Sequence, residues 1–523
     1  MFRIFLAAAL LAAPVAAHAE WHEASTKHFV ILSDDKPEQL AAFARSLERY
    51  DKAMRLFRNI PDREIAPVDR VTVFVLRSVS DIEVLRGEGV AGFYMPRAGN
   101  SVAFTARLGS RPNPGSRARV REELMLDPQS VLRHEYAHHF MFNNWQTAAL
   151  PFWLVEGFAE FHATAEERPD GSVLFGRVPT YRAVNLVYSD GCTVKRILST
   201  SEFSKLGSCV ITDLYAYGWL AVHYLTFTKG GPEKMAAYVL AINRGEPLEK
   251  AALAFGDLNA FQADVTKYLN RPTRTAYTVP AASLKVDEPV IRKLRPGEAA
   301  TMSVRIRSNA GVTKRGAGGV YESAARAAAA YPDDPAAQLV LAEAAFDAEK
   351  YDAAQQAAAR ALKAEPKATK AMVYMGMAKM EVAFDAKSKD PATWREIRRW
   401  FLNANKSDPY DAEPLILYYR SFVMADEAAT DNAEQGLLQA VDFAPQDGRL
   451  RFVAAYVHLT NGDGAAARSA LEVIAYNPHG GGAAKFASKL VDLIDKGNPG
   501  AAMAKLAPRI KDPNYEDEDD KGD

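Results

Sequence analysis

The spacing of hydrophobic and polar residues changes several times along the chain, and each spacing predicts a different kind of element. Short apolar runs at 29–32 and 70–76, the second rich in β-branched residues, predict two buried strands. Between them, residues 37–56 place apolar side chains every three or four positions, which predicts an amphipathic helix. Two further runs, at 92–94 and 101–105, flank a proline and a glycine and predict a hairpin. A small mixed sheet with helices is therefore expected first in the chain.

Helical spacing dominates the stretch that follows. Asp127 and Pro128 suit the cap and the first turn of a helix, which is expected to end before a turn at 143–151. A second helix follows that turn, and residues 224–268 continue the helical pattern. Residues 278–310 differ, because their apolar residues, split by a Pro-Gly pair, favour short strands. This segment is interpreted as a β-rich connector, or as extra strands of the preceding domain.

The last third of the chain is rich in alanine and repeats a helical pattern. Prolines interrupt it at intervals of 33 to 43 residues and separate predicted helix pairs: Pro332, Pro366, Pro409, Pro445 and Pro478. The longest interval predicts an insertion at 384–394 or a lengthened helix. A period of about 34 residues with paired helices resembles tetratricopeptide (TPR) repeats. The resemblance implies a solenoid that binds peptides or proteins in a concave groove, and a plain helical bundle is the alternative.

The first residues predict export. Arg3 precedes an apolar run at 4–15, and Ala17-His18-Ala19 fits a cleavage site, so a signal peptide is expected at 1–19, cut after Ala19. No later run of about 18 apolar residues predicts a membrane span. The mature protein is therefore expected to be periplasmic or secreted.

Composition adds a few further expectations. At 523 residues two or three domains are expected, and a formal net charge of −1 argues against binding nucleic acid by neutralising phosphates. In an oxidising compartment Cys192 and Cys209 are expected to form a disulfide, with two separate buried thiols as the alternative. The acid-rich tail 511–523 is expected to be disordered. His22 and His28 are expected at the surface or at a strand edge rather than at a metal.

The most specific chemical pattern is an H-E-x-x-H motif at 134–138. Residues four apart share one face of a helix, so His134 and His138 can bind one cation. Glu135 then lies beside that cation, where it can accept a proton from a water molecule. A catalytic zinc site uses three protein ligands. Glu156 is the third candidate, because the 17 residues between it and His138 leave room for a turn and a facing second helix.

H-E-x-x-H followed by W-L-x-E-G-x-A-E at 153–160 resembles the gluzincin metallopeptidases, the group that includes thermolysin and the zinc aminopeptidases. The resemblance implies a gluzincin-like metallopeptidase domain over 20–277 that holds Zn²⁺ through His134, His138 and Glu156. Glu160 falls one turn after Glu156 on the same face, and a carboxylate there can hold the N–H of a ligating histidine.

The resemblance also implies a role for a tyrosine. In zinc aminopeptidases a tyrosine in a Y-E-x-G segment downstream of the third ligand stabilises the oxyanion of the tetrahedral intermediate. Tyr215 matches that tyrosine, Gly218 matches the glycine, and Tyr217 is a rival. In gluzincins a strand beside the metal helix binds extended substrate, and residues 101–106 are placed there. The chain has no G-x-M-x-N segment, with which the aminopeptidases bind a free amino terminus, so endopeptidase activity is expected.

The expected architecture is α+β: the gluzincin-like domain, a β-rich connector at 278–318, and an all-α TPR-like solenoid at 319–510. The leading hypothesis is an exported zinc metallopeptidase that cleaves a peptide or protein substrate and binds a protein partner through the repeats. A catalytically inactive periplasmic interaction scaffold is the alternative. A zinc hydrolase acting on a non-peptide amide, such as cell-wall material, is a third hypothesis.

Overall fold

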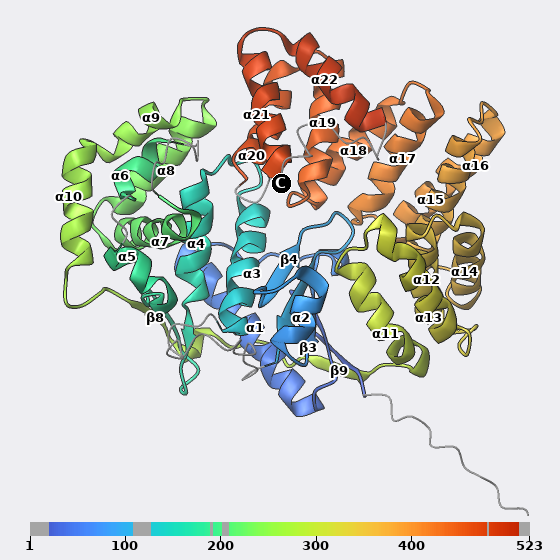
Figure 1. The fold of residues 1–523 in the computed structure, drawn as a ribbon, viewed down its shortest axis with the longest axis horizontal. Coiled ribbons are helices and arrows are strands. Elements are labelled where there is room, and N and C mark those ends of the chain that lie inside the picture. Colours follow the sequence, from blue (N-terminus) through green and yellow to red (C-terminus); the bar gives the residue numbers. More distant parts are fainter. Residues whose placement is uncertain (1–19, 108–126, 189–191, 201–208, 478–480, 512–523) are drawn as a thin grey trace, which may run out of the picture.

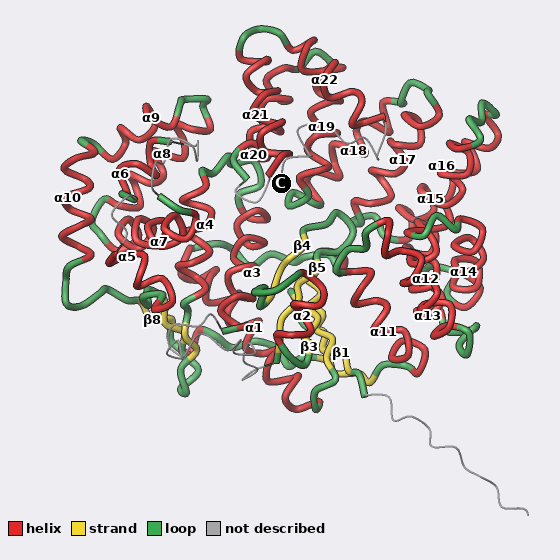
Figure 2. The backbone as a smooth tube through the Cα atoms, viewed as in Figure 1, coloured by secondary structure: helices red, strands yellow, loops and turns green. Residues whose placement is uncertain are grey.

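The computed structural model describes residues 20–107, 127–188, 192–200, 209–477 and 481–511. The expected signal peptide and all but the first residue of the expected acidic tail lie outside the described residues. A mixed α+β region comes first in the chain and helical repeats follow it, as expected (Figure 1). The main group of strands lies in the middle of the molecule, with helices on both sides of it, and a smaller group that includes β8 lies at the lower left (Figure 2).

The main sheet has six strands in the order β4-β5-β3-β2-β1-β9. Their bounds are β1 His22–Ser25, β2 Phe29–Ser33, β3 Val71–Leu76, β4 Gly92–Met95, β5 Val102–Ala106 and β9 Val290–Lys293. The neighbours β2, β3 and β5 run parallel, whereas β4, β1 and β9 are antiparallel to the strands beside them. The two buried strands and the hairpin expected from the sequence are confirmed.

The two faces of this sheet are covered by different helices. Val73 and Val75 of β3 point into a core shared with α1 (Pro37–Arg58) and α3 (Pro128–Asn144). Phe74, between them, points into a second core shared with α2 (Val79–Arg86) and α11 (Pro296–Asn309). Successive side chains of a strand face opposite ways, so a strand such as β3, which is buried along its whole length and apolar except for Thr72, suits a sheet covered on both faces.

The segment 278–318 is not the β-rich connector that its sequence suggested. Strand β9 is part of the main sheet, where it pairs with β1. Residues 296–309 form helix α11 instead of short strands, and Met302 and Ile306 on that helix pack against the sheet. Positions 302 and 306 are also one helical turn apart, so a short apolar pattern of this kind fits either element. The extra strand was the correct alternative for β9, and the strand prediction is wrong for α11.

A second, smaller sheet and several helices complete the region before the repeats. The small sheet contains β6 (Glu166–Glu167), β7 (Val173–Phe175) and β8 (Tyr277–Val279). The helices are α4 Phe152–Ala163, α5 Ala183–Tyr188, α6 Val194–Ser199, α7 Ile211–Phe227, α8 Gly231–Asn243, α9 Leu248–Ala251 and α10 Leu258–Leu269. A disulfide joins Cys192 to Cys209, with 4.6 Å between the Cα atoms, just before α6 and α7. The expected pairing is confirmed, and it is typical of proteins outside the cytoplasm.

Helices α11 to α22 form six consecutive pairs. The remaining eleven helices are α12 Lys314–Ala328, α13 Pro335–Asp347, α14 Tyr351–Ala364, α15 Thr369–Asp385, α16 Pro391–Ser407, α17 Ala412–Ala425, α18 Asp431–Phe443, α19 Gly448–Thr460, α20 Gly464–Ala475, α21 Gly481–Asp495 and α22 Pro499–Lys511. Four of the five expected prolines lie between pairs, and Pro478 lies outside the described residues. The longest interval reflects lengthened helices, because α15 and α16 have 17 residues each whereas α13 has 13.

Candidate metal centre

Helix α3 carries the H-E-x-x-H motif, and its first turn is fixed by local chemistry. The Asp127 carboxylate accepts hydrogen bonds from the backbone N–H groups of Gln129 (2.9 Å) and Ser130 (3.1 Å), and Pro128 occupies the first turn. The cap expected from the sequence is confirmed. A regular helix then places His134 and His138 on one face, one turn apart.

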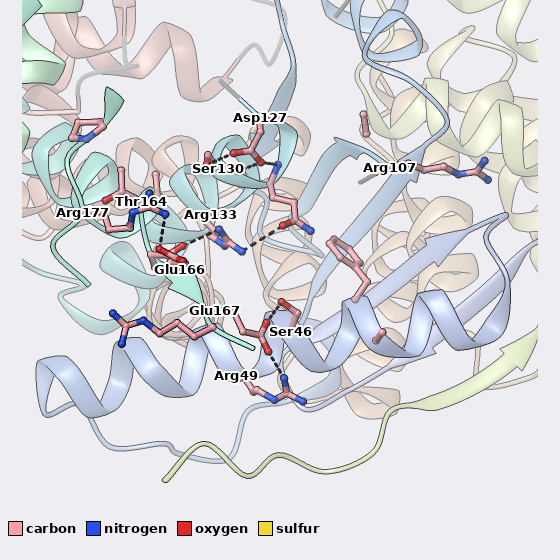
Figure 3. A pocket seen from close by; sticks show the side chains of 18 of the residues that line it. Ser46, Arg49, Arg107, Asp127, Ser130, Arg133, Thr164, Glu166, Glu167 and Arg177 are labelled. Atoms are coloured by element: carbon pink, nitrogen blue, oxygen red, sulfur yellow. Dashed lines mark hydrogen bonds and ion pairs between the residues drawn. The ribbon is translucent and has the colours of Figure 1, made fainter. Parts of the chain in front are cut away.

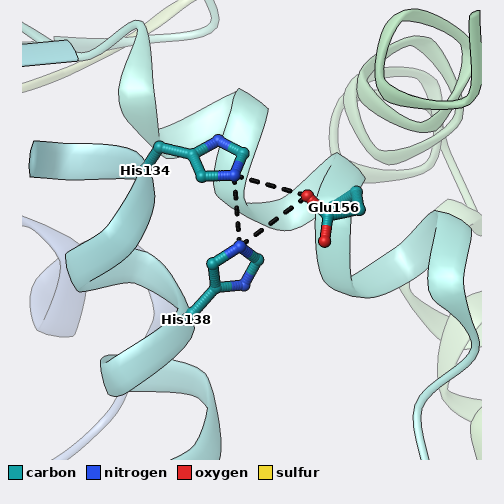
Figure 4. Close-up of side chains that lie close together, drawn as sticks. All are labelled: His134, His138 and Glu156. Carbon is teal, nitrogen blue, oxygen red and sulfur yellow. Dashed lines mark hydrogen bonds and ion pairs between the residues drawn. The ribbon is translucent and has the colours of Figure 1, made fainter. Parts of the chain in front are cut away.

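The three expected ligands converge on one point (Figure 4). Nε2 of His134 lies 3.1 Å from Nε2 of His138, and Oε2 of Glu156 lies 3.3 and 3.7 Å from these two nitrogens. Two donors bound at about 2.1 Å to a tetrahedral zinc ion lie about 3.4 Å apart. These separations, and a donor set of two imidazoles and one carboxylate, therefore fit a zinc ion with a fourth position left for water or substrate. We call these three residues the metal centre.

Glu156 reaches this point because α4 turns back toward α3. The connecting loop is held by Asn243 of α8, whose side chain both accepts from the N–H (2.8 Å) and donates to the carbonyl oxygen (3.1 Å) of Ala149. No sequence motif marks Asn243, so this support was missed. The Glu156 side chain is fully buried, and a buried carboxylate is stabilised by positive charge or a cation beside it.

Two glycines set the approach of α7 to α4. A Cβ atom added to Gly157 would collide with the carbonyl oxygen of Gly218, and one added to Gly218 would lie 2.7 Å from the carbonyl oxygen of Trp153. The backbones therefore touch at a point that only glycine allows. Gly218 had been matched to a family glycine, and the contact supplies the physical reason for a glycine there.

This close contact brings Tyr215 of α7 to the metal centre. The rings of Tyr215 and His134 have centroids 6.0 Å apart, and the Arg182 guanidinium lies 4.7 Å from the centre of the Tyr215 ring. Burial, together with the charge of Glu156, raises the pKa of Tyr215, so its phenol stays protonated and can donate a hydrogen bond. Tyr217 is instead part of the main apolar core. Tyr215 therefore has a ring contact with one of the three candidate ligands.

Negative charge is concentrated around the histidine pair. Burial disfavours the charged form of His134, but the hydrogen bond to Glu156 and the charges of Glu160, Glu156 and Glu135 outweigh it and raise the pKa to about 9. Glu135 is half-buried and close enough to affect the pKa of both His134 and Tyr215. Three carboxylates near two imidazoles make an environment that attracts a cation.

Glu160 faces the ligand that it was expected to support. Its Oε1 lies 3.8 Å from Nδ1 of His134, which is longer than a direct hydrogen bond. Tyr181 donates to Oε2 (2.8 Å), and Nη2 of Arg182 donates to Oε1 (2.7 Å), so the carboxylate is held in place from the opposite side. Tyr181 and Arg182 lie in a short 3-10 turn without a recognisable motif, and the sequence did not identify them.

The other histidines near the motif have structural partners. His139 pairs with the hydroxyl of Tyr94 on β4 (2.8 Å), and burial lowers its pKa to about 3. His162 contacts the carbonyl oxygen of Phe158 (2.7 Å), and His223 contacts that of Gly176 (3.0 Å). These three imidazoles pack within the core.

A second group of histidine and carboxylates lies beneath the opposite face of α3. Nδ1 of His28 lies 3.5 Å from Asp51, and its Nε2 lies 3.4 Å from Asp62; we call these three residues the His28 cluster. Only 5% of the His28 side chain is exposed, so its expected place at the surface is wrong. Two cations lie within the cluster, because Arg55 donates to Asp51 (2.6 Å) and Lys27 donates to Asp62 (2.8 Å).

A hollow of about 1190 Å³ lies along α1 and the first turns of α3 (Figure 3). Its lining includes charged side chains that pair with one another, such as Arg177 with Glu166 (2.5 Å) and Arg49 with Glu167. Arg133, next in sequence to His134, also lines it. The three residues of the metal centre do not, so this hollow is adjacent to the site and separate from it.

Comparison with known proteins adds little to this description. No protein-family model matches the sequence, and no curated protein matches it either. A crystal structure of TTC0263, a thermophilic TPR protein of Thermus thermophilus, covers 40% of this chain and 97% of its own, with 16% identity and a TM-score of 0.29. At that TM-score we draw no conclusion from the likeness. Across the residues that the structure describes, no helix has the length and apolar character needed to cross a bilayer.

Proposed function

We propose that this protein is an exported, zinc-dependent endopeptidase. The observation that carries the proposal is the metal centre: three ligand atoms from α3 and α4 within 3.7 Å of one another, with the spacing of a tetrahedral ion. The likeness of its two motifs to the gluzincins supports the choice of peptide hydrolysis over other zinc chemistry.

Each nearby side chain has a specific task in this proposal. His134, His138 and Glu156 hold zinc, which when bound polarises the substrate carbonyl and makes water more acidic. Glu135 accepts the proton of the attacking water and returns it to the leaving amine. Glu160, held by Tyr181 and Arg182, keeps His134 oriented through the negative charge that faces Nδ1.

Tyr215 is proposed to stabilise the oxyanion of the tetrahedral intermediate. The phenol is neutral at physiological pH because burial raises its pKa, so it has a proton to donate. Arg182 stacks on the ring, which restricts the ring to one position and adds positive charge near the developing oxyanion. Replacing one such donor lowers kcat by about 10²–10³-fold in other hydrolases.

The strand that would bind extended substrate is β4 rather than β5. Residues 101–106 were expected at the edge of the sheet, but β5 is paired on both sides, with β3 and with β4. That expectation is wrong, because the hairpin folds β4 outward and leaves it as the terminal strand of the sheet. Tyr94 of β4 also bonds to His139 of α3, so β4 is the sheet edge nearest to the metal helix. Backbone pairing along β4 is the proposed mode of substrate binding.

An interaction scaffold is the second candidate, and the helix pairs favour it. Stacked helix pairs with a period near that of TPR repeats are typical of proteins that bind other proteins. In this candidate the repeats bind a protein partner, and the metal centre holds zinc without hydrolysis or stays empty.

A metal assay combined with a digestion experiment separates the two candidates. The purified mature protein is expected to contain one zinc per chain and to cleave internal bonds in a peptide library. Glu135→Gln is expected to keep the zinc and to lose hydrolysis by about 10²–10⁴-fold. Glu249→Gln, an exposed glutamate on α9, is the matched control and should behave as the parent. Bound zinc with no cleavage of any peptide by the parent would favour the scaffold.

A further inference from the structure

The loop that joins β4 to β5 reaches into the helical repeats. Residues 96–100, which we call the hairpin tip, contact the start of α19 through two neighbouring side chains. Oδ2 of Asp447 accepts from the N–H of Ala98 (3.1 Å), and Nε2 of Gln446 donates to the carbonyl oxygen of Arg97 (3.0 Å). Gln446 also donates to the hydroxyl of Ser101 (3.3 Å). Backbone groups of the hairpin tip are thus paired with residues almost 350 positions later in the chain.

Gly99 lets the hairpin tip lie close to a charged pair on the repeats. Lys370 of α15 donates to Glu413 of α17 (2.5 Å) and lies 3.2 Å from Asp411. A Cβ atom added to Gly99 would collide with Nζ of Lys370 and would lie 2.6 Å from Oε2 of Glu413. Because glycine has no Cβ atom, the backbone can approach the pair of Lys370 and Glu413 closely.

Arg97 brings positive charge to an acidic part of the same surface. Its guanidinium donates to the carbonyl oxygen of Asn309 at the end of α11 (2.7 Å). Burial raises the pKa of Glu343 to about 7 and that of Asp347 to about 6, and the charge of Arg97 opposes both shifts. These two acids lie on α13, so the hairpin tip meets the repeats with opposite charge.

All of these repeat residues belong to the first helix of a pair or to its cap. They come from α11, α13, α15, α17 and α19 in turn; the first four of these helices contact one another in sequence, and α17 and α19 share one apolar core. We call this surface the inner face. In repeat proteins of this kind such a continuous surface is the one that binds peptides. In Figure 1 the loop after β4 extends from the sheet toward α11 and the repeats.

We propose that the inner face of the repeats is an internal receptor for the hairpin tip, and that Gln446 and Asp447 are positioning residues for the edge strand β4. An edge strand in a short hairpin is held on one side only and is among the first parts of a domain to open. Anchoring its loop on the repeats restricts that opening. A protein partner that uses this face has to displace the hairpin tip. The consequence for substrate binding rests on the proposed function, but the anchoring itself does not.

Hydrogen exchange on the full-length protein tests the anchoring without any substrate. Asp447→Ser combined with Gln446→Ala removes the bonds to the hairpin tip, while the serine hydroxyl keeps the cap of α19. Amide exchange in peptides covering 92–106 is expected to be at least about tenfold faster than in the parent. Asp463→Ser, at the cap of α20 away from the hairpin, is the matched control and should leave these peptides unchanged. Unchanged exchange in the double variant would overturn the proposal.

A variant in the hairpin tip gives an independent test that leaves the repeats intact. Arg97→Glu puts a negative charge opposite Glu343 and Asp347 and is expected to accelerate the same amides at least about tenfold, whereas Arg63→Glu at an exposed site should not. Equal exchange in Arg97→Glu and the parent would contradict the proposal. If the parent hydrolyses peptides, the double variant should raise KM more than it lowers kcat. If the parent is inactive, the exchange result still decides whether the hairpin is anchored.

Discussion

The metal centre and the His28 cluster both bring imidazole and carboxylate groups together at similar separations, on opposite faces of α3. The first has two histidines and a glutamate, and the second has one histidine and two aspartates. In both, a histidine lies within 3.7 Å of a fully buried carboxylate. The difference lies in the surrounding charge. In the His28 cluster Arg55 and Lys27 donate directly to the two aspartates, and Tyr136 donates to Asp51 as well (2.7 Å). At the metal centre Arg182 is paired with Glu160, which is not one of the three grouped residues, and Glu156 faces two imidazoles.

Proximity of histidine and carboxylates therefore does not define a metal site by itself. A cation entering the His28 cluster would have to displace an arginine and a lysine that already pair with the carboxylates, and the buried pair of Arg55 and Asp51 is costly to break. At the metal centre the donor atoms of the two imidazoles and of the Glu156 carboxylate point at one another (Figure 4). The first arrangement stabilises the fold around α1 and α3, whereas the second suits a bound ion.

The largest expected effect is on stability and concerns the His28 cluster. Asp51→Asn removes the charge that Arg55 pairs with in the interior, and this should lower the free energy of unfolding by about 3–5 kcal/mol. Urea denaturation of the metal-free protein measures it. Asp385→Asn, at an exposed helix end, should change the free energy by less than about 0.5 kcal/mol. Loss of zinc from a folded Asp51→Asn protein would mean that the two clusters are not distinct.

At the metal centre the expected effect of a substitution is a loss of zinc affinity rather than a loss of stability. Glu156→Gln keeps the shape of the side chain but removes its charge, and is expected to weaken zinc binding more than about 100-fold, or about 2.8 kcal/mol. Chelator competition followed by metal analysis gives the affinity. Glu160→Gln, which changes a supporting residue, should cost no more than about tenfold to 100-fold. Parent-like zinc affinity in Glu156→Gln would exclude Glu156 as a ligand.

The close contact between α4 and α7 supports the metal centre but not the His28 cluster. Gly157→Ala forces α4 and α7 apart, because the new methyl group meets the Gly218 backbone, and should destabilise the protein by about 2 kcal/mol. Gly318→Ala, in α12 with open space around it, should instead stabilise it by about 0.5–1 kcal/mol. Thermal unfolding of both variants provides the comparison, and equal effects would argue against the close contact.

The smallest expected effect is the contribution of His28 to the pH dependence of stability. Burial opposes the charged form of His28, but Glu48 and Asp51 outweigh it and raise the pKa of the imidazole. A raised pKa in the folded state stabilises the protein below the ordinary value of 6.5, and this contribution is lost as pH rises through the folded-state pKa. His28 also lowers the pKa of Glu48 against the effect of burial, and that contribution is lost as pH falls from the ordinary value of 4.5.

The pair of His28 and Glu48 is therefore expected to contribute most to the free energy of unfolding between about pH 4.5 and 6.5. The destabilisation caused by His28→Gln should be larger at pH 5.5 than at pH 8.5, as measured by urea denaturation of parent and variant at each pH. A difference in the free energy of unfolding that is the same at both pH values would show that folding does not shift the pKa of His28. His223→Gln should show the opposite trend, because burial lowers the pKa of that imidazole to about 4, so that at pH 5.5 mainly the unfolded state is protonated and the destabilisation by the variant should be smaller than at pH 8.5.

The sequence predicted the parts of the site that depend on local spacing. The strands at 29–32 and 70–76, the Asp127 cap and the helix pairs between prolines all lie where they were expected. The errors fall where a local pattern fits two environments. Residues 302–306 satisfy both a strand and a helix, and β5 cannot be told from an edge strand until its partners are known. His28 looked like a surface residue because its partners on α1 lie 20 or more positions away.

By itself, the sequence determined that two imidazoles share one helical face, that a cap starts the helix, and that prolines divide the last third into helix pairs. These features depend on residues within one or two turns of each other, so local geometry fixes them. Only the tertiary structure decided that Tyr215 meets His134, that β4 is the sheet edge, and that the hairpin tip rests on the repeats. Those outcomes depend on contacts between residues far apart in the chain, such as Gly157 with Gly218, and no local spacing specifies such contacts.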